Sequence, residues 1–432
     1  EEADLDFVAL TDHSEADVLL PEGEGGPEYP VWDGQAQSVL DAQASGRLVL
    51  LGYEWSGFRN SLDQGHARGS HRTVLLSDPT ACEAYRVPGW ELAGGESVQE
   101  LGTAIYRQDR LDEVVATPEE LWERLDLARE DCAPVTWLSF AHHPAYEIPQ
   151  QTDWWAEENA PRRENVVEIY SEHGSSECSD LDEEGCDWRI NEGNGYVEAG
   201  SVQAALDRGF KLGFLGGSDS HDARPGSIWD GAGPVGHWED SDGDGEVDQP
   251  IRQFTSGGLS GVWLRGELTA ETLLDAIESR QTLASSGIRP ELKLNARGRY
   301  GESFVMGDVV PASALPLTLS AWTALPDWEG QIIYERIGPG GEVEDRQEGE
   351  QYTGIWEPSE TSWTYLRIRY VSPDGSEERI WISPWFTTGP ESRDCGCSQA
   401  KRPLEPLSLL LIVAIGLGFR SRRGRCPLRC VD

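Results

Sequence analysis

Residues 211–221 read Lys-Leu-Gly-Phe-Leu-Gly-Gly-Ser-Asp-Ser-His, a short apolar run followed at once by Asp219 and His221. An apolar run of this length, bounded by glycines, is typical of a strand buried in a protein core. Two side chains that bind metal ions therefore directly follow an expected core strand. The same arrangement of an apolar run and polar side chains recurs elsewhere in the chain.

Four further apolar runs end in residues of the types that are able to bind metal or activate water. Glu54 ends residues 47–54, and the other three runs are followed by Asp12 and His13, by His142 and His143, and by His173. Parallel strands in α/β enzymes deliver polar residues at their carboxyl ends, where the active site forms. The pattern therefore predicts a site built from several strands.

Helix signals alternate with these strands. Residues 117–120 (Thr-Pro-Glu-Glu) form a capping box with Pro at the first helical position, and Leu121 and Leu125 continue on one helical face. Further helices are expected after Ser201 and after Thr269. Alternation of strands and helices over residues 1–289 predicts a parallel α/β fold.

Imidazole and carboxylate groups without thiolate suit Zn²⁺, Mn²⁺ or Fe²⁺, and a shared carboxylate favours a site with several ions. Ions of this kind lower the pKa of bound water and stabilise the charge of a phosphoester as it is hydrolysed. The sequence therefore predicts a hydrolase. The alternative for any one of these residues, taken alone, is that it is an ordinary turn residue whose side chain forms hydrogen bonds with the backbone.

Together these motifs resemble the PHP (polymerase and histidinol phosphatase) superfamily, and most closely its CehA/McbA-like metallohydrolase branch. The similar segments are residues 11–13, 52–55, 71–74, 141–144, 168–171, 217–221 and 284–289. The resemblance implies a distorted (βα)7 PHP-type barrel with two or three divalent ions. It also implies hydrolysis of phosphoesters or, in some branch members, of carbamate or amide-like esters.

The resemblance also assigns roles to particular residues. The implied metal ligands are His13, Glu54, His71, His143, Asp219 and His221. The implied catalytic residues are Asp12, Glu54 and His221, with Glu54 bridging two ions and Asp12 orienting a ligand or binding metal itself. Glu168 and His173 would line the substrate pocket. An insertion at residues 58–70 leaves His66 or His71 as the match, and the strand-like residues 73–76 favour His71.

The family pattern begins with a strand that carries a His-x-His motif, and this sequence starts after it. We therefore expect an N-terminally truncated chain whose barrel lacks its first strand. Arg224 and Arg72 could meet an anionic substrate. The alternative is that they are loop residues paired with nearby carboxylates.

A separate cation site is possible at Asp240, Asp242, Asp244 and Asp248, which have the spacing of a calcium loop. The final position of that loop is Ile251, so its bidentate Glu is missing. The spacing predicts weak calcium binding, and the alternative is a solvated acidic loop.

Residues 290–390 change to short alternating segments separated by Gly- and Pro-rich turns, which predicts a small antiparallel β-sandwich. A linker, residues 391–406, contains Cys-Gly-Cys. Residues 407–419 form a short apolar run that predicts a transmembrane or sorting helix, and the basic residues 420–432 then predict a cytoplasmic tail. This end resembles the Cys-containing sorting tails of myxobacterial surface proteins, which implies membrane attachment and a sorting protease as a partner.

Charge and cysteines restrict the class further. The formal charge is −42, with 77 acidic against 35 basic residues, which excludes a nucleic-acid-binding body. We expect a disulfide between Cys178 and Cys186, with Cys82 and Cys132 as a second candidate pair. Disulfides and the tail together predict an extracytoplasmic protein at the cell surface or outer membrane.

The leading hypothesis is thus a surface-exposed metal-dependent hydrolase with a small, anionic ester substrate. One alternative is a catalytically inactive PHP-like surface binding module. The other is a structural surface protein whose acidic loops hold calcium.

Overall fold

The computed structural model describes most of the chain up to residue 387. The described residues are 5–14, 31–57, 60–61, 66–67, 70–87, 115, 117–133, 135–146, 152, 154, 163–180, 185–190, 196–219, 257–326, 328–358 and 362–387.

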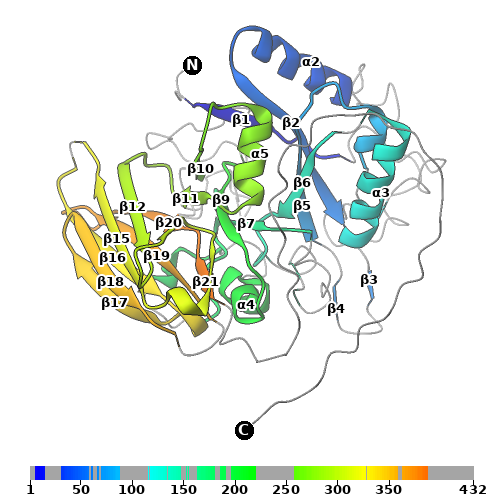
Figure 1. Cartoon of the computed structure of the whole chain (residues 1–432). Coiled ribbons are helices and arrows are strands. Elements are labelled where there is room, and N and C mark those ends of the chain that lie inside the picture. The colour runs from blue at the N-terminus through cyan, green and yellow to red at the C-terminus, as the bar shows by residue number, and fades with distance from the viewer. Residues whose placement is uncertain are drawn as a thin grey trace, which may run out of the picture. The chain divides into compact units, whose positions relative to one another are not determined.

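A seven-stranded sheet carries the residues of the site (Figure 1). Its strands are β1 (Phe7–Leu10), β2 (Leu48–Gly57), β5 (Ser70–Leu76), β6 (Trp137–Ala141), β7 (Val166–Ser171), β8 (Gly174–Ser175) and β9 (Gly213–Gly216). Strands β1, β2, β5, β6 and β7 are neighbours in that order, and β8 and β9 both pair with β7. A separate two-stranded ribbon consists of β3 (Asn60–Ser61) and β4 (His66–Ala67).

Local sequence explains the helices that accompany this sheet. They are α2 (Val31–Ala44), α3 (Pro118–Asp131), α4 (Val202–Asp207) and α5 (Ala270–Glu278). The predicted capping box of α3 is confirmed, since Thr117 and Glu120 cap each other's backbone N–H groups. Ser201 and Thr269 likewise cap α4 and α5, so the start of each predicted helix is confirmed.

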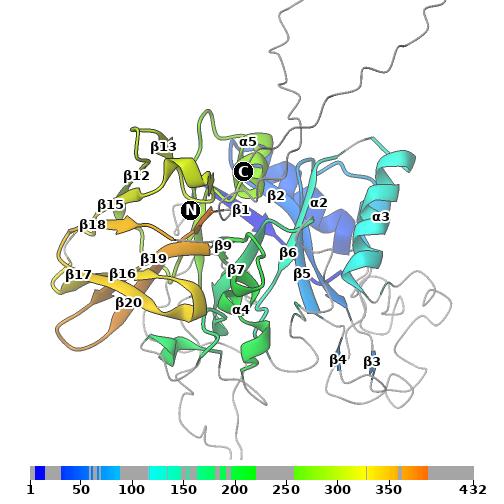
Figure 2. The ribbon, with the colours of Figure 1, turned by 60° about the horizontal axis from the view of Figure 1, so that its bottom comes forward.

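The two faces of the sheet have separate cores. The outer face, with Tyr53 and Trp55 of β2, packs against Leu121 and Leu125 of α3 in one cluster that also includes α2 and α4. Figures 1 and 2 show α2 and α3 beside this outer face. The inner face packs against α5. The buried residues of this second core are Leu50, Leu75, Leu138, Phe140 and Leu215 of the sheet and Leu273, Leu274 and Ile277 of α5.

The expectation of a distorted (βα)7 barrel lacking its first strand is wrong. Strand residues outnumber helix residues, and the described part of the chain holds four α-helices. β2 and β5 are antiparallel, with Gly57 opposite Ser70, and β5 and β6 are antiparallel as well. Antiparallel neighbours do not need a helical crossover, whereas parallel ones do. The sheet is therefore mixed, and it curls into half a barrel.

Two further sheets pack face to face in the C-terminal half. One contains β10 (Leu259–Val262), β11 (Thr282–Ser285), β20 (Glu377–Ile382), β19 (Ser362–Val371), β16 (Gln331–Ile337) and β17 (Val343–Glu348) in that order, with β14 (Val309–Val310) and β21 (Trp385–Thr387) beside them. The other contains β13 (Ser303–Phe304), β12 (Glu291–Arg297), β15 (Leu317–Ala324) and β18 (Gln351–Trp356). Their inner faces share one core, which includes Leu319, Tyr334 and Ile368.

Strands from both sides of residue 290 share the larger sheet. Leu283 of β11 lies opposite Ile382 of β20, and β11 also pairs with β10. The described residues up to 387 belong to one compact unit that extends to Glu391. The linker expected at residues 391–406 lies outside the described residues.

The part of the chain that the structure describes does not contain the transmembrane helix expected from the sequence. Among the residues that the structure describes, no helix combines the length and the apolar character needed to cross a membrane. Residues 407–419, on which the expectation depended, and residues 420–432 lie outside the described part of the chain.

Candidate metal centre

The site lies at one end of the inner face of the seven-stranded sheet. Alternate side chains of a strand share a face, so Glu54 of β2 points to the same side as Leu50, four residues before it. The same alternation brings His71 of β5 and Glu168 of β7 to this face. Each strand thus contributes apolar side chains at one end to the core with α5, and a polar side chain at the other end to the site.

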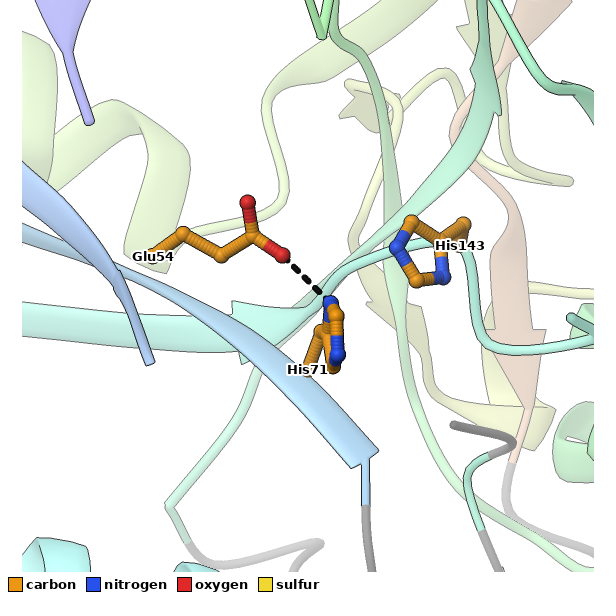
Figure 3. A group of neighbouring side chains, drawn as sticks. All are labelled: Glu54, His71 and His143. Atoms are coloured by element: carbon orange, nitrogen blue, oxygen red, sulfur yellow. Dashed lines mark ion pairs between the residues drawn. The ribbon is translucent and has the colours of Figure 1, made fainter. Parts of the chain in front are cut away.

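Glu54, His71 and His143 form a group that could hold a metal ion. Nδ1 of His71 lies 2.5 Å from Oε1 of Glu54, and the ring centroids of His71 and His143 are 4.9 Å apart. All three residues are buried, and one ligand atom of each lies within 4.8 Å of the others. Figure 3 shows the side chains of Glu54, His71 and His143 pointing toward one another.

The properties of His143 fit metal ligation. Its Nδ1 is buried and has no hydrogen-bond partner among the described residues. Burial, together with the neighbouring imidazoles of His142, His71 and His173, holds the pKa of His143 well below its ordinary value. The ring is therefore neutral at physiological pH and keeps a lone pair, which is the form that binds metal.

Asp219 belongs to two further groups of potential ligands. One consists of His142, His143 and Asp219, and the other of Glu172, His173 and Asp219, with ligand atoms within 4.8 Å in each group. Oδ2 of Asp219 is 3.3 Å from Nε2 of His142 and 2.7 Å from Nε2 of His173. Residues that could hold a cation thus continue from the first group toward the turn after β7.

His142 lies among three carboxylates. Its Nδ1 is 2.9 Å from Oε1 of Glu168. Burial opposes its charged form, but Glu168, Asp219 and Glu54 outweigh this effect and hold the pKa of His142 well above its ordinary value. Burial raises the pKa of Glu168. Burial also opposes ionisation of Asp219, yet His142 and His173 keep its pKa well below the ordinary value.

Two ligand candidates have unusual backbone geometry. His143 has a φ of 31° and Asp219 has a φ of 50°, both in the left-handed region. Such conformations cost about 1–3 kcal/mol for residues other than Gly and are concentrated at functional sites. Both strained residues lie within the ligand groups described above.

His13 and Asp12 lie beside the first group. The backbone N–H of Glu54 donates to the carbonyls of Thr11 and Asp12, which holds this segment against the end of β2. Nε2 of His13 is 3.6 Å from Oε2 of Glu54, while Asp12 is exposed at the edge of the adjacent cavity. Burial disfavours ionised Glu54, but His142, His71 and His13 lower its pKa.

A cavity of about 780 Å³ adjoins these residues. Glu54, His142, Glu168 and Asp219 line its polar side, and apolar side chains of β1, β9 and the α5 core line the rest, together with Arg289. At least one residue of each ligand group therefore lines this cavity.

Several predicted site residues lie outside the described part of the chain. They are His221, Arg224 and the acidic loop residues Asp240, Asp242, Asp244 and Asp248. His66 is described only as a member of β4, opposite Ser61. Arg72 is fully buried and pairs through Nε with Oε1 of Glu164 at 2.9 Å, on the opposite face of β5 from His71.

From the sequence, His142 was noted after a strand but was not assigned as a ligand, and Glu172 was not singled out. His142 could have been found from the alternation of β6, because Leu138 and Phe140 face inward and position 142 continues that face. Glu172 has no comparable signal, since it lies in the turn between β7 and β8.

Both expected cysteine pairs are bonded. Cys178–Cys186 has a Cα–Cα distance of 5.8 Å, and Cys82–Cys132 has one of 6.3 Å. Disulfides are compatible with an oxidising, extracytoplasmic compartment.

A family model described as "Protein of unknown function (DUF3604)" matches residues 28–310. No curated protein and no solved structure matches the chain significantly. The matched range includes all three ligand groups and covers well over half of the sequence. The chain therefore belongs to the DUF3604 family.

Proposed function

We propose that this protein is a metal-dependent hydrolase whose first cation position is formed by Glu54, His71 and His143. The observation that carries the proposal is the buried Nδ1 of His143, which lacks a hydrogen-bond partner among the described residues and lies beside the Glu54–His71 pair. Two imidazoles and one carboxylate suit Zn²⁺, Fe²⁺ or Mn²⁺. When bound, such an ion activates water and polarises a phosphoryl or carbonyl oxygen.

The protein's own residues have distinct roles in this proposal. Glu168 fixes the orientation of the His142 ring through the 2.9 Å contact with Nδ1, which leaves Nε2 facing Asp219 and Glu54. An imidazole oriented in this way can hold a proton at Nε2 and pass it to a leaving oxygen. The buried surroundings exclude bulk water from that proton.

The resemblance to the PHP superfamily supports phosphoesters as the substrate class, and two or three ions remain a prediction of that resemblance. The disulfides support action outside the cytoplasm. A small substrate would enter through the 780 Å³ cavity that Glu54 and Asp219 line.

The test uses the full-length protein with Zn²⁺, Mn²⁺ or Fe²⁺ and a chromogenic phosphodiester or phosphomonoester. We expect turnover that a chelator abolishes and that returns when the metal is added back. Glu54→Gln should lower both metal affinity and turnover by at least about 100-fold, because it removes a charged ligand. Glu130→Gln, on the exposed face of α3, is the matched control and should leave both unchanged. Wild-type levels of bound metal in Glu54→Gln would contradict the proposed site.

A further inference from the structure

The turn between β7 and β8 presents two potential ligands to Asp219. Nε2 of His173 is 2.7 Å from Oδ2 of Asp219, and Glu172 adds a second carboxylate within 4.8 Å of both. The His173 side chain is 14 % exposed, so it is largely shielded from solvent. The three residues bring one imidazole and two carboxylates to a single point.

This group shares no residue with Glu54, His71 and His143, but the two groups are adjacent. The rings of His143 and His173 are 5.4 Å apart and nearly perpendicular. The two groups also differ in chemistry. The first has two imidazoles and one carboxylate, whereas the second is richer in oxygen and suits harder cations such as Mn²⁺ better.

The turn is held rigidly at its base. Ser171 pairs with Gly174 across the turn, and the Oγ of Ser171 accepts from the backbone N–H of His173 at 3.3 Å. Gly174 has a φ of 116°, and a Cβ at this position would lie 2.9 Å from the carbonyl oxygen of Trp188, so the tight turn requires Gly here.

A buried carboxylate three residues after the turn anchors it to the larger sheet of the sandwich. Glu177 is fully buried and accepts hydrogen bonds from the hydroxyl of Tyr365 at 2.6 Å, from Nε1 of Trp381 at 2.8 Å and from Nη1 of Arg367 at 3.1 Å. The ring of Tyr170, just before the turn, stacks on Trp381 with centroids 5.3 Å apart. The ligand positions are therefore preorganised from both sides of the turn.

We infer that Glu172, His173 and Asp219 form a second cation position, separate from the one at Glu54, His71 and His143. The inference rests on the proposed function and assigns His173 to a ligand role rather than to the substrate pocket.

The test measures metal bound per protein chain, after equilibrium dialysis of the full-length protein, by mass spectrometry of the metal. The variants are His173→Ala, Glu172→Gln, His71→Ala and the double variant of His71 and His173, with Glu130→Gln as a control. His173→Ala and His71→Ala should each bind one ion fewer than the wild type, and the double variant two fewer. Glu172→Gln keeps the size of the side chain, so a weaker second ion in this variant cannot be attributed to misfolding.

Two results would overturn the inference. One is a wild-type metal count in both His173→Ala and Glu172→Gln, and the other is a double variant that loses no more metal than either single variant. An unchanged count in His71→Ala alone would instead contradict the proposed function, and a loss confined to His173→Ala would still support the second position.

Discussion

Buried carboxylates have two different kinds of partner in this protein. At the site, Glu54, Glu168 and Asp219 form ion pairs with the imidazoles of His71, His142 and His173. Arginines of the larger sheet of the sandwich instead neutralise Glu335 and Glu377 of that sheet and Glu177, which follows β8. The first arrangement leaves carboxylates available to a cation, whereas the second satisfies them within the protein.

Glu177→Gln tests the structural kind of charge. Because Arg367 would remain buried with one of its carboxylate partners gone, we expect the free energy of unfolding to fall by about 3–5 kcal/mol. Chemical denaturation measures it. Asp126→Asn is the matched control. Asp126 pairs with Arg163 at the surface, where their side chains are 39 % and 40 % exposed, respectively. An exposed pair of this kind contributes about 0–1 kcal/mol. Equal effects of the two variants would show that Glu177 is not structurally important.

The ion pairs of Glu377 should make the stability of the folded protein depend on pH. Burial favours its protonated form, but Arg369 and Arg379 outweigh burial and lower its pKa. Nε and Nη2 of Arg369 donate to it at 2.9 and 2.7 Å. A lowered pKa in the folded state stabilises the protein above the ordinary pKa of the group, and this stabilisation disappears as pH falls through the lowered value. Glu377→Gln should therefore lose about 1–3 kcal/mol at pH 7, and its difference from wild type should shrink toward pH 3. A difference that stays constant with pH would contradict the role of Glu377.

At the scale of elements, the disulfides constrain two different parts of the chain. Cys82–Cys132 closes a separation of 50 residues and links the segment after β5 to the end of α3. Cys178–Cys186 closes a separation of 8 residues, directly after Glu177. Gly185, inside that loop, accepts a hydrogen bond from Arg379 through its carbonyl oxygen. The ends of the short loop are therefore joined by a disulfide, and its Gly185 is bonded to Arg379 of β20.

Loop length predicts unequal effects of removing these disulfides. Loop-closure entropy assigns about 4 kcal/mol to the longer loop and about 2.5 kcal/mol to the shorter one. The double variant Cys82→Ser/Cys132→Ser should therefore lower the thermal midpoint more than Cys178→Ser/Cys186→Ser. Calorimetry of both variants beside the wild type measures the difference. The reverse order would mean that the contacts of the short loop with Arg379 depend on its disulfide.

The sequence predicted local elements better than their assembly. The start of α3 was predictable because its capping box is a local interaction of Thr117 with Glu120. The direction of β5 was not, because an apolar run such as residues 73–76 reads the same in a parallel or an antiparallel pair. The placement of β11 beside β20 depends on contacts about 100 residues apart, such as Leu283 with Ile382, for which the sequence has no signal. In the site, the histidines that follow apolar runs were predictable, but Glu172 was not, because one acidic residue has no distinctive signal in a chain with 77 of them.

At the scale of the whole molecule, the candidate metal centre connects segments that are far apart in sequence. Glu54, His71 and His143, which could hold one ion, come from β2, from β5 and from the turn after β6, so a cation bound between them would link these parts of the curled sheet. A ligand that binds only the folded state stabilises it by mass action.

Metal removal should therefore lower the stability of the whole protein. With metal at about 100 times its dissociation constant, the expected stabilisation is about 2.7 kcal/mol for each ion. Differential scanning fluorimetry with chelator, and then with added Zn²⁺ or Mn²⁺, measures the shift of the thermal midpoint. His71→Ala should show a smaller shift than the wild type, and Glu130→Gln the same shift. A midpoint that does not respond to metal in the wild type would contradict the centre.

The sharing of one sheet by β10, β11 and β20 has a practical consequence. A chain cut at residue 290 would leave β11 without the strand opposite Leu283 and Ser285. The exposed N–H and C=O groups of that edge would then be a template for other strands, which promotes aggregation. Proteolysis or gene truncation near this position should yield insoluble material rather than an autonomous catalytic half.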